Sequence, residues 1–330
     1  MKYFTEPQGR FVIKIPTEWQ YKNILAGDEE ISPFSFELYE NPMGAFQISC
    51  YSESEKPIPP HVKYQKANTN NLEFVKARND QDGFNIHLWY AAVEGHLIMA
   101  KYIYEVEKSE NPELQKDFEK VEKALSTLEL LSEDKRKLAI DLNKYENFMA
   151  SLAASFDLKM KAMENMSLIE LLVITGNQID AFLRMSVVLK KQLINKTNEV
   201  DIGLLFQGES DSPIMERKIY KQAKDLGIIS QETYENLENL YKERNKVIHR
   251  YIISDFKTKY LYDIAFHYEK ICEEVRLKLK AIEDEQFSEG VGIYKGKDPN
   301  IEHQKEEINL LFSQVNDKHL LETLKRKIDY

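Results

Sequence analysis

The spacing of apolar residues changes near residue 131, and this change constrains the fold more than any other feature. Before it, apolar side chains recur at alternate positions, as in residues 84–90, and after it they recur three and four positions apart, as in residues 168–186. Alternate spacing is typical of strands with one buried face, whereas the longer spacing is typical of amphipathic helices. The sequence therefore predicts an α+β protein, in which an antiparallel-sheet α/β sandwich precedes an all-α antiparallel helical bundle.

A charged run at residues 131–137 marks the expected domain boundary, and 330 residues suffice for two domains. The predicted organisation is a sandwich at 1–131, a helical linker at 132–159, a bundle at 160–285, and a flexible segment with a C-terminal helix at 286–330. The apolar residues of that last helix fit packing on the bundle or on a partner, and the sequence does not choose between them.

The first part has the pattern of an antiparallel meander. It contains a long hairpin whose arms, 84–90 and 96–104, meet near Glu94 and Gly95. His87 alternates with the apolar residues of the first arm, so we expect it to face solvent.

Charge and cysteine content exclude several classes of function. The net charge of −10 argues against broad electrostatic binding to nucleic acid or to anionic membranes. Two distant cysteines indicate neither a disulfide framework nor a thiolate metal site. The N-terminus lacks the apolar run of a signal peptide, and we see no stretch long enough to span a bilayer. These features predict a cytoplasmic protein with no membrane contact, metal or cofactor.

One region departs from the acidic average. Residues 242–259 contain six basic residues but only two acidic ones. Such a basic island suits a confined anionic ligand better than a long duplex. Charge alone, however, favours an ordinary solvated helix surface.

The same region carries an arginine on a buried helix face. Arg244 shares the spacing of apolar neighbours that include Leu237, Leu240 and Val247. A guanidinium is costly to bury unpaired, so Arg244 needs a wet interface or a carboxylate such as Asp180. His249 lies about 140° away around the axis at 3.6 residues per turn. The two side chains can converge if the helix ends near residue 248, or if two copies of the helix meet.

The run Arg244-Asn245-x-x-x-His249 resembles the R-N-x-x-x-H signature of HEPN domains, small four-helix proteins that often dimerise and often cleave RNA without a metal. With Tyr251 it also resembles the R-x-x-x-x-H-x-Y form of HEPN toxins that pair with a nucleotidyltransferase antitoxin. The resemblance covers about residues 160–285. It implies a metal-independent endoribonuclease, such as a toxin or a phage-defence effector, that acts at a cleft between two copies. The implied partners are RNA, a second copy of the chain and an antitoxin or regulatory protein.

The resemblance also implies roles for the motif residues. His249 would be the general base or acid, Arg244 would hold the phosphate oxygens, and Asn245 would orient the phosphate or the histidine. Tyr251 would be the modified or substrate-binding residue, with further phosphate contacts from Lys246 and Arg250. The alternative is a non-catalytic scaffold that dimerises or binds a nucleotide. In that case Arg244 is a structural ion pair and His249 interacts with the helix dipole.

Two weaker patterns were weighed. Residues 9–16 and Trp19 are similar to the opening strand of PsbP-like domains, α/β sandwiches without a common activity, but they equally fit an ordinary strand ended by proline. The glycines of residues 290–296, followed by Lys297, lack the positions that dinucleotide and Walker loops require. We therefore expect that segment to be a connector.

Overall fold

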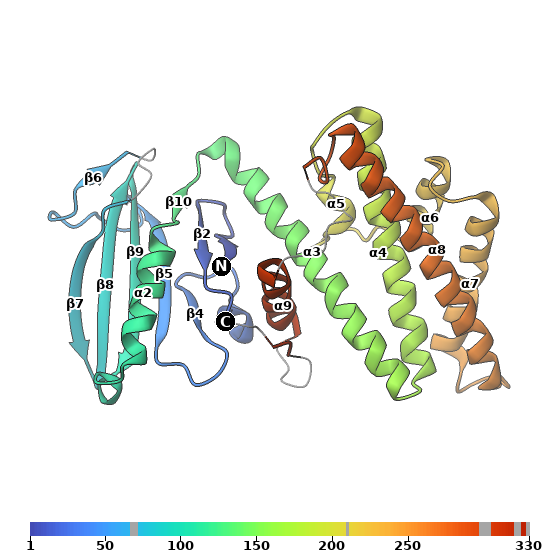
Figure 1. The fold of residues 1–330 in the computed structure, drawn as a ribbon, viewed down its shortest axis with the longest axis horizontal. Helices are drawn as coiled ribbons and strands as arrows, with labels where there is room; N and C mark the ends of the chain where they lie inside the picture. The colour runs from blue at the N-terminus through green and yellow to red at the C-terminus, as the bar shows by residue number, and fades with distance from the viewer. Residues whose placement is uncertain (67–71, 209–210, 297–304, 320–324, 328–330) are drawn as a thin grey trace. The chain divides into compact units, whose positions relative to one another are not determined.

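The computed structural model describes residues 1–66, 72–208, 211–296, 305–319 and 325–327 (Figure 1). The chain forms two compact units. Unit 1 comprises Met1–Asn143 and Gln304–Tyr330, and unit 2 comprises Lys144–His303. The α+β fold class is confirmed, because the strands belong to unit 1 and unit 2 is helical.

Unit 1 contains two sheets among its described residues. The larger has the order β3-β4-β5-β9-β8-β6, with β7 also paired to β8, and only its β6–β8 pair is parallel. The smaller has the order β1-β2-β10. The strands are β1 (Lys2–Thr5), β2 (Phe11–Ile15), β3 (Trp19–Tyr21), β4 (Phe34–Leu38), β5 (Ala45–Ser52), β6 (Tyr64–Gln65), β7 (Val75–Gln81), β8 (Phe84–Val93), β9 (His96–Glu105) and β10 (Glu129–Leu130).

Helix α2 (Glu113–Leu125) covers one face of the larger sheet, and its side chain Val121 belongs to the same buried cluster as Trp89 (Figure 1). This packing corrects the expectation for His87. Its ring lies 4.5 Å from that of Phe118 on α2, so the residue is half-buried rather than exposed to solvent. Burial, with the nearby charge of Arg78, lowers the pKa of His87.

The C-terminal helix α9 (Lys305–His319) belongs to unit 1 and is held there by polar contacts. The buried Lys2 Nζ donates to Ser313 Oγ at 2.8 Å and to Asp317 Oδ2 at 2.6 Å. Tyr39 donates its hydroxyl to Asp317 Oδ1 at 2.8 Å, and Ser313 Oγ donates to the carbonyl of Thr17 at 2.6 Å. The helix therefore packs on the N-terminal part of the chain, an arrangement that the sequence pattern did not indicate.

Unit 2 is a helical bundle in which α4 is the central helix. Its longer members α4, α7 and α8 and the shorter α6 share one apolar core. We expected no stretch long enough to span a bilayer, but α4 is long and apolar enough to do so. Of its most apolar 18-residue stretch, 72% is buried inside the structure, as in the core helix of a bundle. The helices of both units whose bounds have not yet been given are α1 (Asn23–Ala26), η1 (Val106–Lys108), α3 (Glu133–Glu164), α4 (Leu168–Asn195), α5 (Ile202–Leu205), α6 (Glu216–Asp225), α7 (Gln231–Arg250) and α8 (Lys259–Glu289).

The structure divides the chain differently from the predicted domains. The predicted linker at 132–159 is part of the continuous helix α3, whose second part contributes the buried Ala150 and Ala154 to unit 2. Residues 286–296, which were expected to be flexible, have defined contacts with the bundle. Gln286 is fully buried at the end of α8 and accepts a hydrogen bond from the backbone N–H of Tyr294 at 3.2 Å. Lys297 lies outside the described residues.

Candidate functional site: the C-terminal end of α7

The motif residues lie on one uninterrupted helix. Ser230 caps α7, because its Oγ accepts a hydrogen bond from the N–H of Thr233 at 3.0 Å, and the helix continues to Arg250. It therefore does not end near residue 248. Of the two ways in which Arg244 and His249 could converge, only the meeting of two copies is compatible with this helix.

Arg244 points into the bundle and is 8% exposed. Its Nη1 donates to Glu216 Oε1 at 2.8 Å and its Nη2 donates to Glu216 Oε2 at 2.6 Å. The carboxylate partner is thus Glu216, the first residue of α6, and not Asp180, which accepts from Arg184 Nε at 2.6 Å. In the single chain, both outer nitrogens of the guanidinium already donate to Glu216, whereas the buried Nε has no hydrogen-bond partner among the described residues.

The surroundings of Arg244 are built to fit this ion pair. The guanidinium carbon lies 5.1 Å from the ring centroid of Tyr241, and a Cβ at Gly176 on α4 would lie only 2.7 Å from Nη1. Burial of the guanidinium by itself lowers its pKa, but the hydrogen bonds and charge of Glu216 outweigh burial and raise the pKa of Arg244 above its ordinary value. Arg244 is consequently a permanent cation with a matched counter-ion.

The other predicted site residues face outward. His249, Lys246 and Arg250 are exposed and Asn245 is half-buried. At about 100° per residue, these four side chains span about 140° of the helix circumference. We call them the outer band of α7. Lys246 Nζ donates to Glu243 Oε1 at 2.6 Å, and the pair is solvent-exposed and therefore weak.

Tyr251 is not the free, exposed residue that its position suggested. It is half-buried directly after α7, and its hydroxyl lies 2.8 Å from Thr258 Oγ1. Its ring meets that of Phe256 edge-on, with centroids 6.1 Å apart. The residue anchors the turn between α7 and α8.

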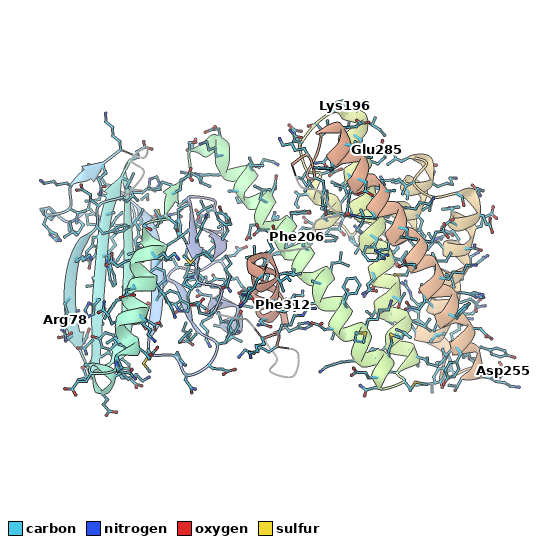
Figure 2. All side chains as sticks on the ribbon, viewed as in Figure 1. Arg78, Lys196, Phe206, Asp255, Glu285 and Phe312 are labelled. Carbon is cyan, nitrogen blue, oxygen red and sulfur yellow. The ribbon has the colours of Figure 1, made fainter. Side chains whose placement is uncertain are left out.

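Three isoleucines are exposed beside the outer band. Ile252 and Ile253 are 93% and 81% exposed, and Ile248 is also exposed. They lie at the end of α7 and in the turn that carries Asp255 (Figure 2). Contiguous exposed apolar residues are unusual on a surface that stays in water and are typical of an interaction site. We call these three residues the isoleucine rim.

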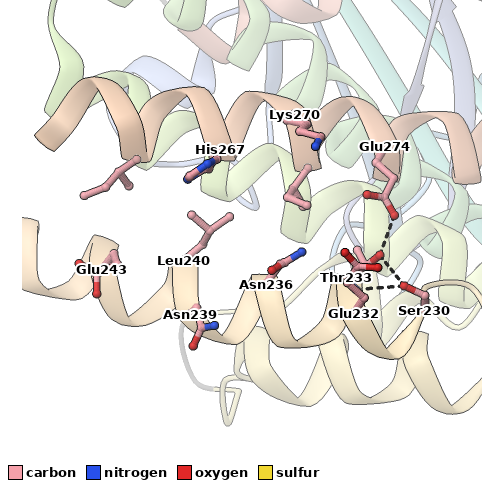
Figure 3. A pocket seen from close by; sticks show the side chains of 12 residues that line it. Ser230, Glu232, Thr233, Asn236, Asn239, Leu240, Glu243, His267, Lys270 and Glu274 are labelled. Atoms are coloured by element: carbon pink, nitrogen blue, oxygen red, sulfur yellow. Dashed lines mark hydrogen bonds between the residues drawn. The ribbon is translucent and has the colours of Figure 1, made fainter.

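A pocket of about 460 Å³ lies between α7 and α8 (Figure 3). Sequence reasoning missed it, because the residues that α7 and α8 contribute lie about 30 positions apart and have no motif spacing. Within the described residues, no group of three or more histidine, cysteine or acidic side chains could hold a metal ion. The pocket is lined by Ser230, Glu232, Thr233, Asn236, Asn239, Leu240, Glu243, Ile264, His267, Lys270, Ile271 and Glu274.

Comparisons with known proteins add little. No family model matches the chain, and no curated protein matches it. A crystal structure of a protein from Bacteroides thetaiotaomicron VPI-5482 is similar over 74% of this chain and 79% of that chain, with 16% sequence identity and a TM-score of 0.27. A likeness of that size carries no argument about fold or function.

Proposed function

We propose that unit 2 is a HEPN-type, metal-independent endoribonuclease that acts at a cleft formed by two copies of the chain. The observation that carries this proposal is the exposed His249 at the end of α7, within a band that also contains Asn245, Lys246 and Arg250. RNA supplies its own nucleophile, the ribose 2′-hydroxyl, so the site needs a group that transfers protons and cations that stabilise the phosphorane. Imidazole serves the first need near neutral pH.

The ion pair with Glu216 changes the part assigned to Arg244. Because its outer nitrogens are occupied, the phosphate contacts fall to the outward-facing Lys246 and Arg250. Arg244 is then a positioning residue that fixes α7 against α6 and so sets the direction of His249.

The dimer in this proposal rests on the isoleucine rim. Burial of three large apolar side chains against a second copy would remove them from water and bring two outer bands close together. An RNA substrate fits a cytoplasmic location, and a toxin or phage-defence role with an antitoxin or regulatory partner fits this activity.

A second candidate is a non-catalytic scaffold that dimerises or binds a nucleotide. The specific observation that favours it is the bidentate Arg244–Glu216 ion pair, which forms within a single chain and involves no ligand. His249 in the last turn of α7 would then stabilise the negative end of the helix dipole.

Incubation of the purified protein with total RNA in EDTA separates the two candidates. We expect cleavage by the wild type and a rate about 10²–10⁴-fold lower for His249→Ala, the usual contribution of a general acid or base. The matched control is His61→Ala, which removes an exposed histidine from unit 1. Absence of cleavage by the wild type would favour the scaffold. Full activity of His249→Ala would contradict the proposed role of His249 as general acid or base.

A further inference from the structure

The α7–α8 pocket has an apolar floor and polar walls. Leu240, Ile264 and Ile271 are buried beneath it, whereas Asn236 and His267 are exposed beside it. In Figure 3, Asn236 extends from α7 into the space between the helices, and His267 extends from α8 toward Leu240. Such a combination suits a flat ligand that is apolar on its faces and polar at its edge.

The charges around the pocket exclude an anionic group from its interior. Among the described residues that line it, the carboxylates of Glu232, Glu243 and Glu274 outnumber the single lysine, Lys270. Glu274 Oε1 accepts a hydrogen bond from Thr233 Oγ1 at 2.7 Å and closes one end. A phosphate would meet net negative charge here, whereas an uncharged ring with hydrogen-bonding edges would not. A nucleobase has this chemistry.

The pocket continues into the outer band. Asn236, Asn239, Glu243, Lys246 and Arg250 follow one another at spacings of three and four, so they share one face of α7. Leu240 and Lys246 are separated by about 9 Å along the axis at 1.5 Å per residue. A ring seated over Leu240 can therefore direct its sugar and phosphate toward Lys246 and Arg250.

His249 flanks the same cations. It lies about 60° around the helix from Lys246, on the side away from the pocket. A strand that crosses α7 from the pocket thus passes Lys246 before it reaches His249.

We infer that the α7–α8 pocket binds an unpaired base of a single-stranded RNA, with Asn236 at the base edge and His267 at its face. The amide of asparagine matches the donor and acceptor groups of base edges, and aromatic rings stack on unpaired bases. A paired base cannot enter, because its edge is already occupied by its partner. For its RNA substrate this inference rests on the proposed function, but binding is measurable without cleavage.

Fluorescence anisotropy with short 2′-O-methyl oligoribonucleotides tests the pocket, because these strands lack the nucleophile and cannot be cut. We expect the wild type to bind single strands, and Asn236→Ala and His267→Ala to weaken the Kd about tenfold each, as for a lost hydrogen bond to a base or a lost stacking contact. Asn147→Ala, an exposed asparagine of α3 outside the pocket, should bind as the wild type does. Unchanged melting temperatures show that the variants fold.

Three further ligands test whether binding depends on the bases, on an unpaired strand, or on a single nucleotide alone. A strand with abasic sites and a self-complementary duplex should both bind more weakly than the single strand. Equal affinity for the abasic strand, equal affinity of Asn236→Ala and His267→Ala with the wild type, or tighter binding of free nucleoside monophosphates than of the strand would each overturn the inference.

The same assay keeps this inference separate from the proposed catalysis. If the wild type binds that strand through Asn236 and His267 but never cleaves natural RNA, the pocket stands and the ribonuclease proposal fails. If the wild type cleaves RNA while the pocket variants bind and cleave normally, the pocket inference fails and the ribonuclease stands.

Discussion

Arg244 illustrates how the burial of one charged side chain determines what that residue can do. A buried guanidinium and its bidentate carboxylate partner depend on each other, because either group alone would be a desolvated charge without a counter-ion. In this protein the partner comes from α6, and the space for the pair comes from a glycine of α4. The residue most typical of the motif is therefore the one least available to a ligand in the single chain.

The residue-scale prediction concerns this ion pair. Arg244→Met and Glu216→Gln should each lower the free energy of unfolding of unit 2 by about 3–5 kcal/mol, because each leaves its partner buried without a matched charge or hydrogen bond. The double variant should lose less than the sum of the two. Helical circular dichroism during urea unfolding measures the loss, since both tryptophans, Trp19 and Trp89, lie in unit 1 and report on that unit instead.

An exposed ion pair of the same helices provides the control for that cycle. Arg217 on α6 pairs with Glu238 on α7, and the arginine is largely exposed. Arg217→Ala should therefore lower the free energy of unfolding far less than either variant of the buried pair. Each single variant of the Arg244–Glu216 pair could lower the free energy of unfolding by less than about 1 kcal/mol, or the two effects could simply add in the double variant. Either result would show that the buried pair is not structural.

At the scale of elements, helices are positioned by contacts that their own sequences do not reveal. The tail helix α9 packs on unit 1 because Lys2, near the start of the chain, supplies the cation for Asp317. The pocket between α7 and α8 likewise exists only because the two helices meet along their length. The sequence pattern identifies each helix, but it does not identify the element on which that helix packs.

The element-scale prediction follows from the anchoring of α9. Asp317→Asn should lower the free energy of unfolding of unit 1 by about 1–3 kcal/mol, because the buried Lys2 loses its charged acceptor. Tryptophan fluorescence in urea reports this loss, and hydrogen exchange should be faster in the amides of α9. Lys318→Gln, at an exposed position of the same helix, should leave both measurements unchanged. Equal exchange in the two variants would contradict the anchoring role of Asp317.

At the scale of the whole molecule, assembly decides whether the proposed active site exists. In one chain, His249 lies at an exposed helix end beside apolar residues that none of the described residues of unit 2 covers. Burial of such a surface against a second copy lowers the free energy of the assembly. The proposed ribonuclease is thus a property of two chains, whereas the ion pair and the fold of each unit are properties of one.

The corresponding prediction is a dimer whose formation depends on the isoleucine rim. Light scattering after gel filtration should give twice the 38.7 kDa of a single chain for the wild type. The double variant Ile252→Ser with Ile253→Ser should elute as a monomer, keep its melting temperature because both side chains are exposed, and lose RNA cleavage. A wild type that stays monomeric at every concentration, or a double variant that still dimerises, would remove the basis of the shared cleft.

Local sequence patterns were sufficient to predict that strands precede helices and to identify the buried face of several elements. The α+β class follows from local periodicity, and so do the 84–105 hairpin and the apolar face of α7 that contains Arg244. Periodicity could establish these features because a strand or helix repeats over a few residues and needs no distant contact. It also showed that Arg244 required an anionic partner or a wet interface.

Which side chains contact one another became known from the packing of the elements. Glu216 rather than Asp180 pairs with Arg244, α2 covers His87, α9 joins unit 1, and α8 completes a pocket with α7. Each contact joins residues that are far apart in sequence or whose separation has no helical or strand repeat. Their meeting depends on how whole elements pack, and packing is set by the sum of many side-chain contacts rather than by any local pattern.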